Sequence, residues 1–195
     1  MMQPDEYRTI DDVSTAIFKD KGSRFIALAS PAFSIEEAML FIEQVRRDYH
    51  DARHHCYAYK IGYGDDQWRV NDDGEPSGSA GNPIMGQIKS FDLTNIVIVV
   101  VRYFGGTLLG VGGLINAYRS ASKFALEAAS VSTRIRMDRY LVEFPYSRMN
   151  FVMKILKERN IDQTDQKFEL DCSWSSLCGK MRQPTCLNNS DRLMR

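Results

Sequence analysis

The sequence predicts an α+β protein: a two-layer α/β unit followed by a small ferredoxin-like unit. Segments with an apolar period of 2 alternate along the chain with segments whose period is near 3.6. The pattern changes near Met137, where a strand, a helix and further strand-like sequence follow, as at the β-α-β-β start of a ferredoxin-like unit. A length of 195 residues accommodates both units. We therefore expect domains at residues 1–136 and 137–195.

The first predicted elements are a β-hairpin and a helix. Residues 15–19 and 24–30 form the hairpin strands around Asp20-Lys21-Gly22, whose glycine suits a tight turn. Ser34 opens the helix, and Glu37 three residues later completes a capping box. The buried stripe of this helix has spacings of 3 and 4 and consists of Ile35, Ala38, Ile42, Val45 and Tyr49.

The remaining elements follow from apolar runs and helix-start signals. Asn82 is a suitable N-cap, and Pro83 suits the first position of a helix. Residues 96–104 are a continuous β-branched run, typical of a central strand. The expected order is strands at 55–59 and 68–70, a helix from 82 to about 91, the strand at 96–104, a helix at 114–129, a strand at 139–146, a helix from Ser147 and a strand at 166–174. The pattern after Trp174 is weak, which leaves open whether the second unit is complete.

Composition limits the classes of function. The chain has 25 basic and 25 acidic residues, divided as 15 and 17 in residues 1–136 and as 10 and 8 in residues 137–195. A nucleic-acid site must therefore be a local patch. The acidic N-terminus is unlike an export signal, and the longest strongly apolar run, Ile96 to Val101, is too short to span a membrane. Four cysteines without a CxxC spacing indicate reduced thiols, so we expect a cytoplasmic protein.

A glycine-rich segment, residues 105–113 (GGTLLGVGG), joins the buried strand to the long helix. Backbone N–H groups and the helix dipole favour anions at such a helix start. Ile115 breaks the GxGxxG fingerprint and Val111 breaks the Walker pattern, so the glycines could equally serve only tight turns and close packing. The predicted phosphate or nucleic-acid site consists of Arg102, Tyr103, Gly105, Gly106, Gly110, Gly112, Gly113 and Arg119. Either Tyr103 or Phe104 could stack on a base, but strand alternation turns one of them inward.

The second unusual segment is the acidic loop, residues 71–79 (NDDGEPSGS). Its carboxylates, Asp72, Asp73 and Glu75, could accept backbone N–H bonds and brace glycine turns, bind a hard cation, or perform acid–base chemistry. The EF-hand spacing is not met. His54, His55 and Cys56 could add metal ligands, but a strand directs neighbouring residues to opposite faces. We expect no metal and no cofactor.

The stretches KGSRFIA (21–27), DARHHCYAYKIG (51–62), NDDGEPSGSAGNPI (71–84) and VVVVRYFGGTLLGVGGLINAYRSA (98–121) together resemble the signature of the YigZ/IMPACT family. The resemblance implies a first domain like domain IV of elongation factor G and a second like its domain V. It also implies a link to translational control, in which IMPACT acts. The residues that match the family pattern in the acidic loop and beside it are His54, Asn71, Asp72, Asp73, Gly74, Glu75 and Ser77. Ser79 stands where the family usually has threonine.

Three functions remain open. The resemblance favours a translation-linked regulator that binds RNA, the ribosome or a protein of the translation machinery through a face built from both loops. A phosphate-ester or nucleotide hydrolase using the acidic loop is an alternative, and so is a module that only binds protein. An open basic strip would favour RNA, a carboxylate with a raised pKa in a closed pocket would favour an enzyme, and an exposed apolar patch would favour a protein partner. Neither the oligomeric state nor the physiological partner follows from the sequence.

Overall fold

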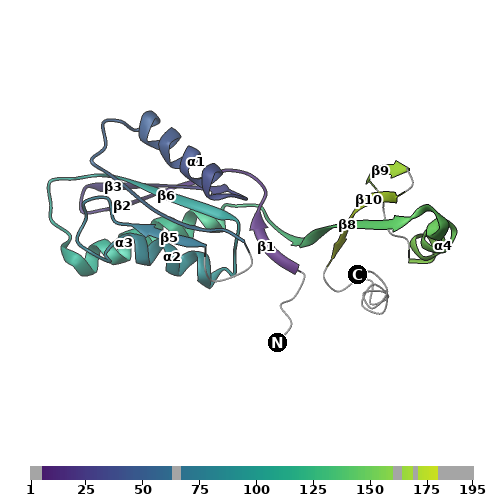
Figure 1. Ribbon diagram of the computed structural model, residues 1–195. Coiled ribbons are helices and arrows are strands. Elements are labelled where there is room, and N and C mark those ends of the chain that lie inside the picture. The colour runs from purple at the N-terminus through teal and green to yellow at the C-terminus, as the bar shows by residue number, and fades with distance from the viewer. Residues whose placement is uncertain (1–5, 63–66, 160–163, 169–170, 180–195) are drawn as a thin grey trace. The chain divides into compact units, whose positions relative to one another are not determined.

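The structure is a computed structural model that describes residues 6–62, 67–159, 164–168 and 171–179 (Figure 1). The chain divides into two compact units, of which residues 7–134 form the larger, whereas Glu6 and residues from 135 onward belong to the smaller. Helices and antiparallel sheets occur in both, which confirms the α+β class. No helix among the described residues is long and apolar enough to cross a membrane.

The larger unit is built around a five-stranded antiparallel sheet. Its strands, in spatial order, are β2 (Ser14–Asp20), β3 (Ser23–Pro31), β6 (Ile96–Tyr103), β4 (His54–Lys60) and β5 (Trp68–Asn71). The β-branched run of β6 lies in the centre, with a hydrogen-bonded neighbour on each side. This position explains why every residue from 96 to 102 is buried.

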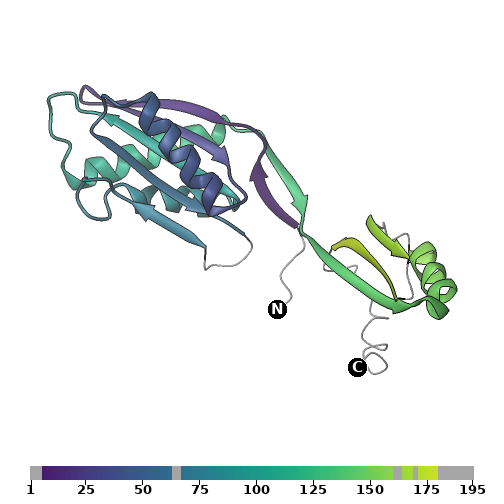
Figure 2. The same cartoon turned by 45° about the horizontal axis from the view of Figure 1, so that its top comes forward.

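The predicted two-layer arrangement is wrong for this unit, because helices cover both faces of the sheet (Figures 1 and 2). Helix α1 (Ile35–Asp48) packs on the face that carries Val97, Val99 and Val101. Helices α2 (Gly81–Ser90) and α3 (Gly110–Glu127) pack on the face that carries Ile96, Ile98 and Val100. A central strand that is apolar at successive positions needs cover on both sides, and three layers provide it.

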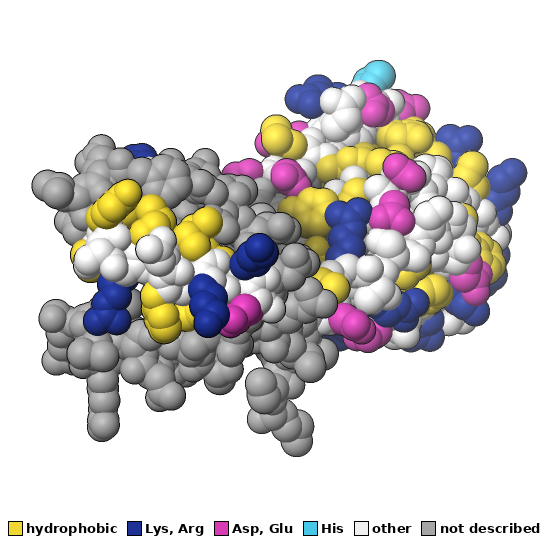
Figure 3. Space-filling model, turned by 90° about the vertical axis from the view of Figure 1, so that its right-hand side faces the viewer, with side chains coloured by type: hydrophobic (Ala, Val, Ile, Leu, Met, Phe, Trp, Pro, Cys, Tyr) yellow, Lys and Arg dark blue, Asp and Glu magenta, His cyan; other side chains and the backbone are white. Residues whose placement is uncertain are grey.

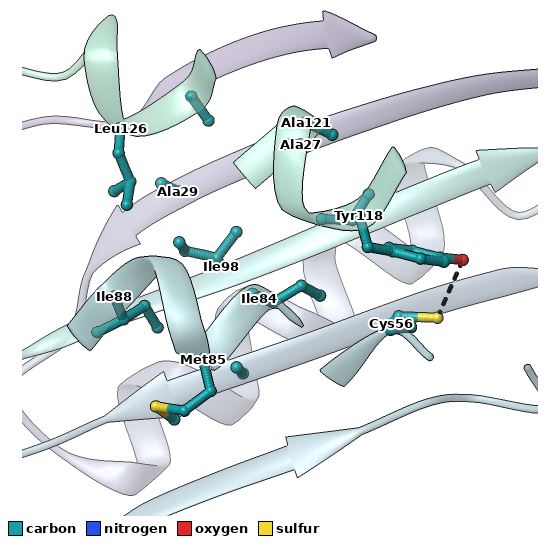
Figure 4. Close-up of a cluster of buried hydrophobic side chains, with 14 of the residues drawn as sticks. Ala27, Ala29, Cys56, Ile84, Met85, Ile88, Ile98, Tyr118, Ala121 and Leu126 are labelled. Atoms are coloured by element: carbon teal, nitrogen blue, oxygen red, sulfur yellow. Dashed lines mark hydrogen bonds between the residues drawn. The ribbon is translucent and has the colours of Figure 1, made fainter. Parts of the chain in front are cut away.

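The core between the sheet and α2 and α3 is shown in Figure 4. Ile84 and Ile88 of α2 point into this core, and α3 contributes Tyr118 and the small residue Ala121. On β3 the small residues Ala27 and Ala29 face α3, which allows the helix to approach the strand closely. The spacing of apolar residues predicts a buried face on this helix that is only partly correct. Its members Leu114, Ala117, Ala121 and Ala125 are buried, whereas Phe124 and Ala128 are exposed and the buried Tyr118 was not predicted.

Two helices begin earlier than predicted. Helix α2 begins at Gly81 instead of Asn82, because the backbone N–H groups of Ala80 and Gly81 donate to the Asp72 carboxylate. Helix α3 begins at Gly110 instead of Leu114. By contrast, Ser34 caps α1 as predicted, since its hydroxyl accepts from Glu37 N at 3.2 Å.

Two strands that lie in the larger unit except for one end residue each were not predicted. They are β1 (Glu6–Ile10) and β7 (Val131–Ile135), which form a separate two-stranded sheet. Next to β1, the Asp11 carboxylate accepts hydrogen bonds from Ser132 Oγ at 2.7 Å and Arg134 Nη2 at 2.9 Å. These two donors hold the pKa of Asp11 below its usual value.

The smaller unit contains one three-stranded sheet, in the order β8-β10-β9. Its elements are β8 (Met137–Pro145), the 3₁₀ turn η1 (Tyr146–Arg148), α4 (Met149–Arg159), β9 (Thr164–Phe168) and β10 (Asp171–Gly179). The single strand predicted at 166–174 is therefore part of two antiparallel strands. Phe144, Leu156 and Cys172 form its small core. The completeness of this unit depends on residues after 179, which lie outside the described residues.

Candidate functional site

The acidic loop lies beside one end of the central sheet, and its own carboxylates hold it in shape. Asp72 Oδ1 accepts from Ala80 N at 2.9 Å and Gly81 N at 2.8 Å, and its Oδ2 accepts from Gly78 N at 2.7 Å. This carboxylate thereby serves as the N-terminal cap of α2 and closes the loop at the same time. The structure thus gives Asp72 the bracing role that was one of its predicted alternatives.

Asp73 ties the loop to β4 and α1. Its Oδ2 accepts from His55 N at 2.7 Å, and its Oδ1 accepts from Arg46 Nη2 at 2.9 Å. The backbone carbonyl of Asp73 lies 2.9 Å from His54 Nδ1. Because a carbonyl only accepts, Nδ1 carries the proton, and in the neutral ring Nε2 keeps its lone pair. Asn71 completes the turn, since its Oδ1 accepts from Asp73 N at 2.7 Å.

Glu75 is the one acid of the loop that turns into the protein interior. Its side chain is 4% exposed, and Oε1 accepts from Arg102 Nη1 at 2.7 Å and from the Tyr118 hydroxyl at 2.8 Å. The Arg102 side chain is only 7% exposed, and its guanidinium lies 5.5 Å from the Phe25 ring centre and 5.7 Å from that of Phe104. Its Nε has no hydrogen-bond partner among the described residues. A buried ion pair therefore connects the acidic loop to the end of β6.

Cys56 and Tyr118 extend this buried network (Figure 4). Cys56 Sγ lies 3.0 Å from the Asp72 carbonyl oxygen and 3.3 Å from the Tyr118 hydroxyl. Burial raises the pKa of the Cys56 thiol and that of the Tyr118 hydroxyl well above their usual values. Both groups are therefore protonated at neutral pH, and Cys56 is not an activated nucleophile.

The glycine-rich segment is exposed and forms the start of α3. No side chain caps this helix, and its first turn contains no acidic residue. Gly106 and Gly110 have φ values of 87° and 70°, which favour glycine. Gly105 lies so close to the β2–β3 turn that a Cβ there would be 1.8 Å from the carbonyl carbon of Gly22. Gly112 is different, because a Cβ would meet nothing within 4 Å and φ is not positive.

Three apolar side chains accompany these glycines on the surface. Phe104 is 56% exposed, Leu108 is 83% exposed and Val111 is 53% exposed. Such a group within eight residues is more apolar than an ordinary solvated loop and is typical of a contact surface. We name the exposed residues 104–112 the helix-start loop.

The predicted site residues are only partly brought together. His54, Glu75 and Arg102 lie at one end of the sheet on the same face, as the β4–β6 register shows by pairing His54 with Arg102. Tyr103 faces the opposite side, where its hydroxyl donates to Asp51 Oδ1 at 2.6 Å and Arg24 covers its ring at 4.5 Å. Arg119 is exposed on α3, Ser77 is exposed in the loop, and Gly74 has a φ of 85°. A Cβ at Gly113 would lie 3.0 Å from Leu109 Cβ.

Sequence reasoning missed Tyr118 as a site residue. Tyr118 was not among the residues predicted for the apolar face of this helix, although it is fully buried, and its hydroxyl gave no separate signal. The described residues contain no group of three or more His, Cys, Asp or Glu side chains placed to hold a metal ion. On the face shown in Figure 3, basic and acidic side chains of the described residues are interspersed.

Comparison with known proteins places this site within a recognised sequence family. A family profile described as the Impact N-terminal domain matches residues 21–126, which include both loops and Arg102. A relative from Escherichia coli (strain K12), named IMPACT family member YigZ, is 37% identical over 144 residues, which cover 73% of this chain and 71% of the relative. A relative from Thermus thermophilus, named IMPACT family member in pol 5'region, is 38% identical over 140 residues, which cover 72% of this chain and 75% of the relative.

A solved structure is similar over nearly the whole chain. It is described as the crystal structure of a hypothetical protein, is 29% identical and has a TM-score of 0.75. The similarity covers 98% of this chain and 93% of that chain.

Proposed function

The chain belongs to the IMPACT family, and from this premise we propose that it is a translation-linked regulatory protein of the cytoplasm. It binds RNA, the ribosome or a protein of the translation machinery. The translational role is what the family resemblance implies, and the binding face is the helix-start loop together with the acidic loop. In the same proposal, the 1–136 domain is like domain IV of elongation factor G, and the 137–195 domain is ferredoxin-like, as in domain V of that factor.

One observation carries the proposal: the helix-start loop is exposed, glycine-rich and uncapped, whereas the acidic loop beside the sheet end is fixed by hydrogen bonds. N–H groups at the start of an 18-residue helix attract phosphate or carboxylate oxygens. Arg119, nine residues after Gly110 and therefore in the third turn, supplies a positive charge on the same helix. Arg102 contributes indirectly, because its ion pair with Glu75 holds the acidic loop in place.

The hydrolase alternative fits this site less well. Each of its three carboxylates already accepts from groups of the protein itself. Asp72 accepts from backbone N–H groups, Asp73 from His55 N and Arg46 Nη2, and Glu75 from Arg102 and Tyr118. A carboxylate that braces a loop is poorly placed to accept a substrate proton. A purely protein-binding module is the second candidate, and the exposed Phe104, Leu108 and Val111 favour it.

A pull-down from cell lysate, with and without nuclease, tests the proposal. We expect the tagged full chain to capture ribosomal RNA or translation proteins, and we expect Leu108→Asp to reduce that capture at least tenfold. Leu40→Asp is the matched control, because Leu40 is 63% exposed on α1 and belongs to neither loop. Loss of capture after nuclease identifies RNA as the ligand, and retained capture identifies a protein. Equal capture by wild type and Leu108→Asp would remove the helix-start loop from the proposal.

A further inference from the structure

Strand β2 forms an open edge of the central sheet. All seven of its residues pair with β3, from Ser14 with Ala29 to Asp20 with Ser23, without a bulge. Among the described residues, no other backbone hydrogen bond involves β2. The outward N–H and C=O groups of a regular strand of this length are a template for a further strand.

Apolar side chains line this edge on both faces of the sheet. On the α1 face, Ile17 is 54% exposed, because α1 packs over β6 and β4 instead of β2. On the other face, the rings of Phe18 and Phe124 lie 6.1 Å apart, and Phe124 of α3 is 42% exposed. A strand added here would therefore bury apolar surface above and below the backbone ladder.

We propose that two copies of this chain pair through β2, antiparallel, about a two-fold axis at Ile17. The sequence of β2 itself favours a second copy of this chain as the partner strand, and it favours pairing centred on Ile17. Ile17 is the middle residue of Ser14–Asp20, so symmetric pairing about it uses all seven residues and places Ile17 against its counterpart. Lys19 then lies opposite Thr15 of the other copy, and Asp20 lies opposite Ser14. In this register no two like charges lie opposite each other, and like charges in that position would destabilise the pair. Pairing of a strand with its own copy does not avoid such contacts in general.

The position of α3 supports the same arrangement. This helix packs chiefly on β2 and β3, and Ser14 Oγ donates to the Ala125 carbonyl oxygen at 2.8 Å. Neighbouring strands are about 4.8 Å apart, and the two-fold axis lies midway between β2 and the β2 strand of the other copy. A helix that lies above the midline between β2 and β3 is therefore roughly 5 Å from that axis, measured across the strands. The two α3 helices would then be about 10 Å apart, which is an ordinary helix-packing distance. Phe124 contacts Phe18, next to the axis, so the Phe124 side chains of the two copies would meet across it.

Cysteine cross-linking tests both the pairing and its register. In this arrangement the Ile17 Cα atoms are about 5 Å apart, within the span of a disulfide. The two Thr15 residues are four positions out of register, or roughly 13 Å apart, which is too far. After mild oxidation, we expect Ile17→Cys to give a disulfide-linked dimer on a non-reducing gel. We expect Thr15→Cys to give no more linked dimer than the wild type, whose four native cysteines set the background.

Sedimentation velocity of the full chain provides the second measurement. We expect a concentration-dependent dimer that Ile17→Lys weakens at least tenfold, while Leu40→Lys leaves it unchanged. Leu40 is a similarly exposed apolar position on α1 (63% against 54% for Ile17). Thermal melts confirm that the variants are folded. A monomer at all concentrations would overturn the proposal, and so would equal cross-linking through positions 15 and 17. The proposal would also be overturned if the chain were monomeric and its β2 strand paired with a different protein, since a second copy would then not be the partner of β2.

Discussion

Glu75 shows how a single residue connects the acidic loop to the sheet. It accepts from Arg102 at 2.7 Å and from Tyr118 at 2.8 Å in a buried setting. We predict that Glu75→Ala lowers the free energy of unfolding by about 3–5 kcal/mol, because it leaves the Arg102 charge buried without its partner. Urea unfolding followed by fluorescence measures the change.

The matched control replaces both members of the pair. The double variant Glu75→Leu with Arg102→Met removes the uncompensated charge, so it should recover most of the lost free energy. If Glu75→Ala unfolds within about 0.5 kcal/mol of the wild type, the size of an ordinary surface substitution, the ion pair is not what fixes the loop.

For single residues, the sequence predicts which side chains are important better than it predicts which residues they contact. Its family pattern identified Glu75 and Arg102, and hydrogen-bond chemistry suggested that the loop acids brace glycine turns. It gave no sign that these two residues, 27 positions apart, meet inside the protein. That contact depends on the path of the intervening loop and on α2, whose start is set by Asp72 and not by its own sequence.

The start of α3 allows a prediction at the scale of one element. Gly112 lies in the first turns of the helix, with open space around it and no positive φ. Nothing in the fold of the larger unit requires glycine here, and glycine in a helix costs about 0.5–1 kcal/mol relative to alanine. Gly112→Ala should therefore raise the free energy of unfolding by that amount, and it should weaken capture of the translation ligand if that ligand approaches the backbone closely.

Gly105 is the matched comparison. A Cβ at this position would overlap the backbone of Gly22, so Gly105→Ala should lower stability, and urea midpoints of both variants measure the difference. A loss of stability in Gly112→Ala would contradict the idea that its glycine is free of packing demands. Unchanged capture would argue against close approach of the ligand.

Element types follow well from periodicity, whereas boundaries and layers do not. The hairpin and β6 agree with their apolar patterns. Helix α1 buries Ala38, Ile42 and Val45 of its predicted stripe, but Ile35 is 40% exposed. The glycines at 110–113 resemble a loop although they are helical. Strands β1 and β7 are short, and the side chains of β7 are half-buried or exposed, so no strong alternation marks them. The third layer was missed because the apolar run of β6 shows that both faces of the sheet must be buried, but it does not show which face each helix packs against.

For the whole molecule, we predict that residues 1–136 fold alone. This fragment contains both cores of the larger unit and both strands of the β1–β7 sheet. It should unfold in one cooperative urea transition and bind little hydrophobic dye. A fragment ending at 130 is the control, because it removes β7 together with the partners of Asp11 and should unfold at lower urea.

The pH dependence of these two fragments adds a separate check. The pKa of Asp11 is lowered in the folded state, so its contribution to stability is present above its unfolded pKa of about 3.9 and is lost as pH falls through the lower folded value. The difference between the fragments should therefore shrink on acidification below about pH 4. A dye-binding, non-cooperative 1–136 fragment would show that the larger unit needs the rest of the chain. A difference that stays constant into acid would show that β7 acts through its backbone pairing with β1 and not through Asp11.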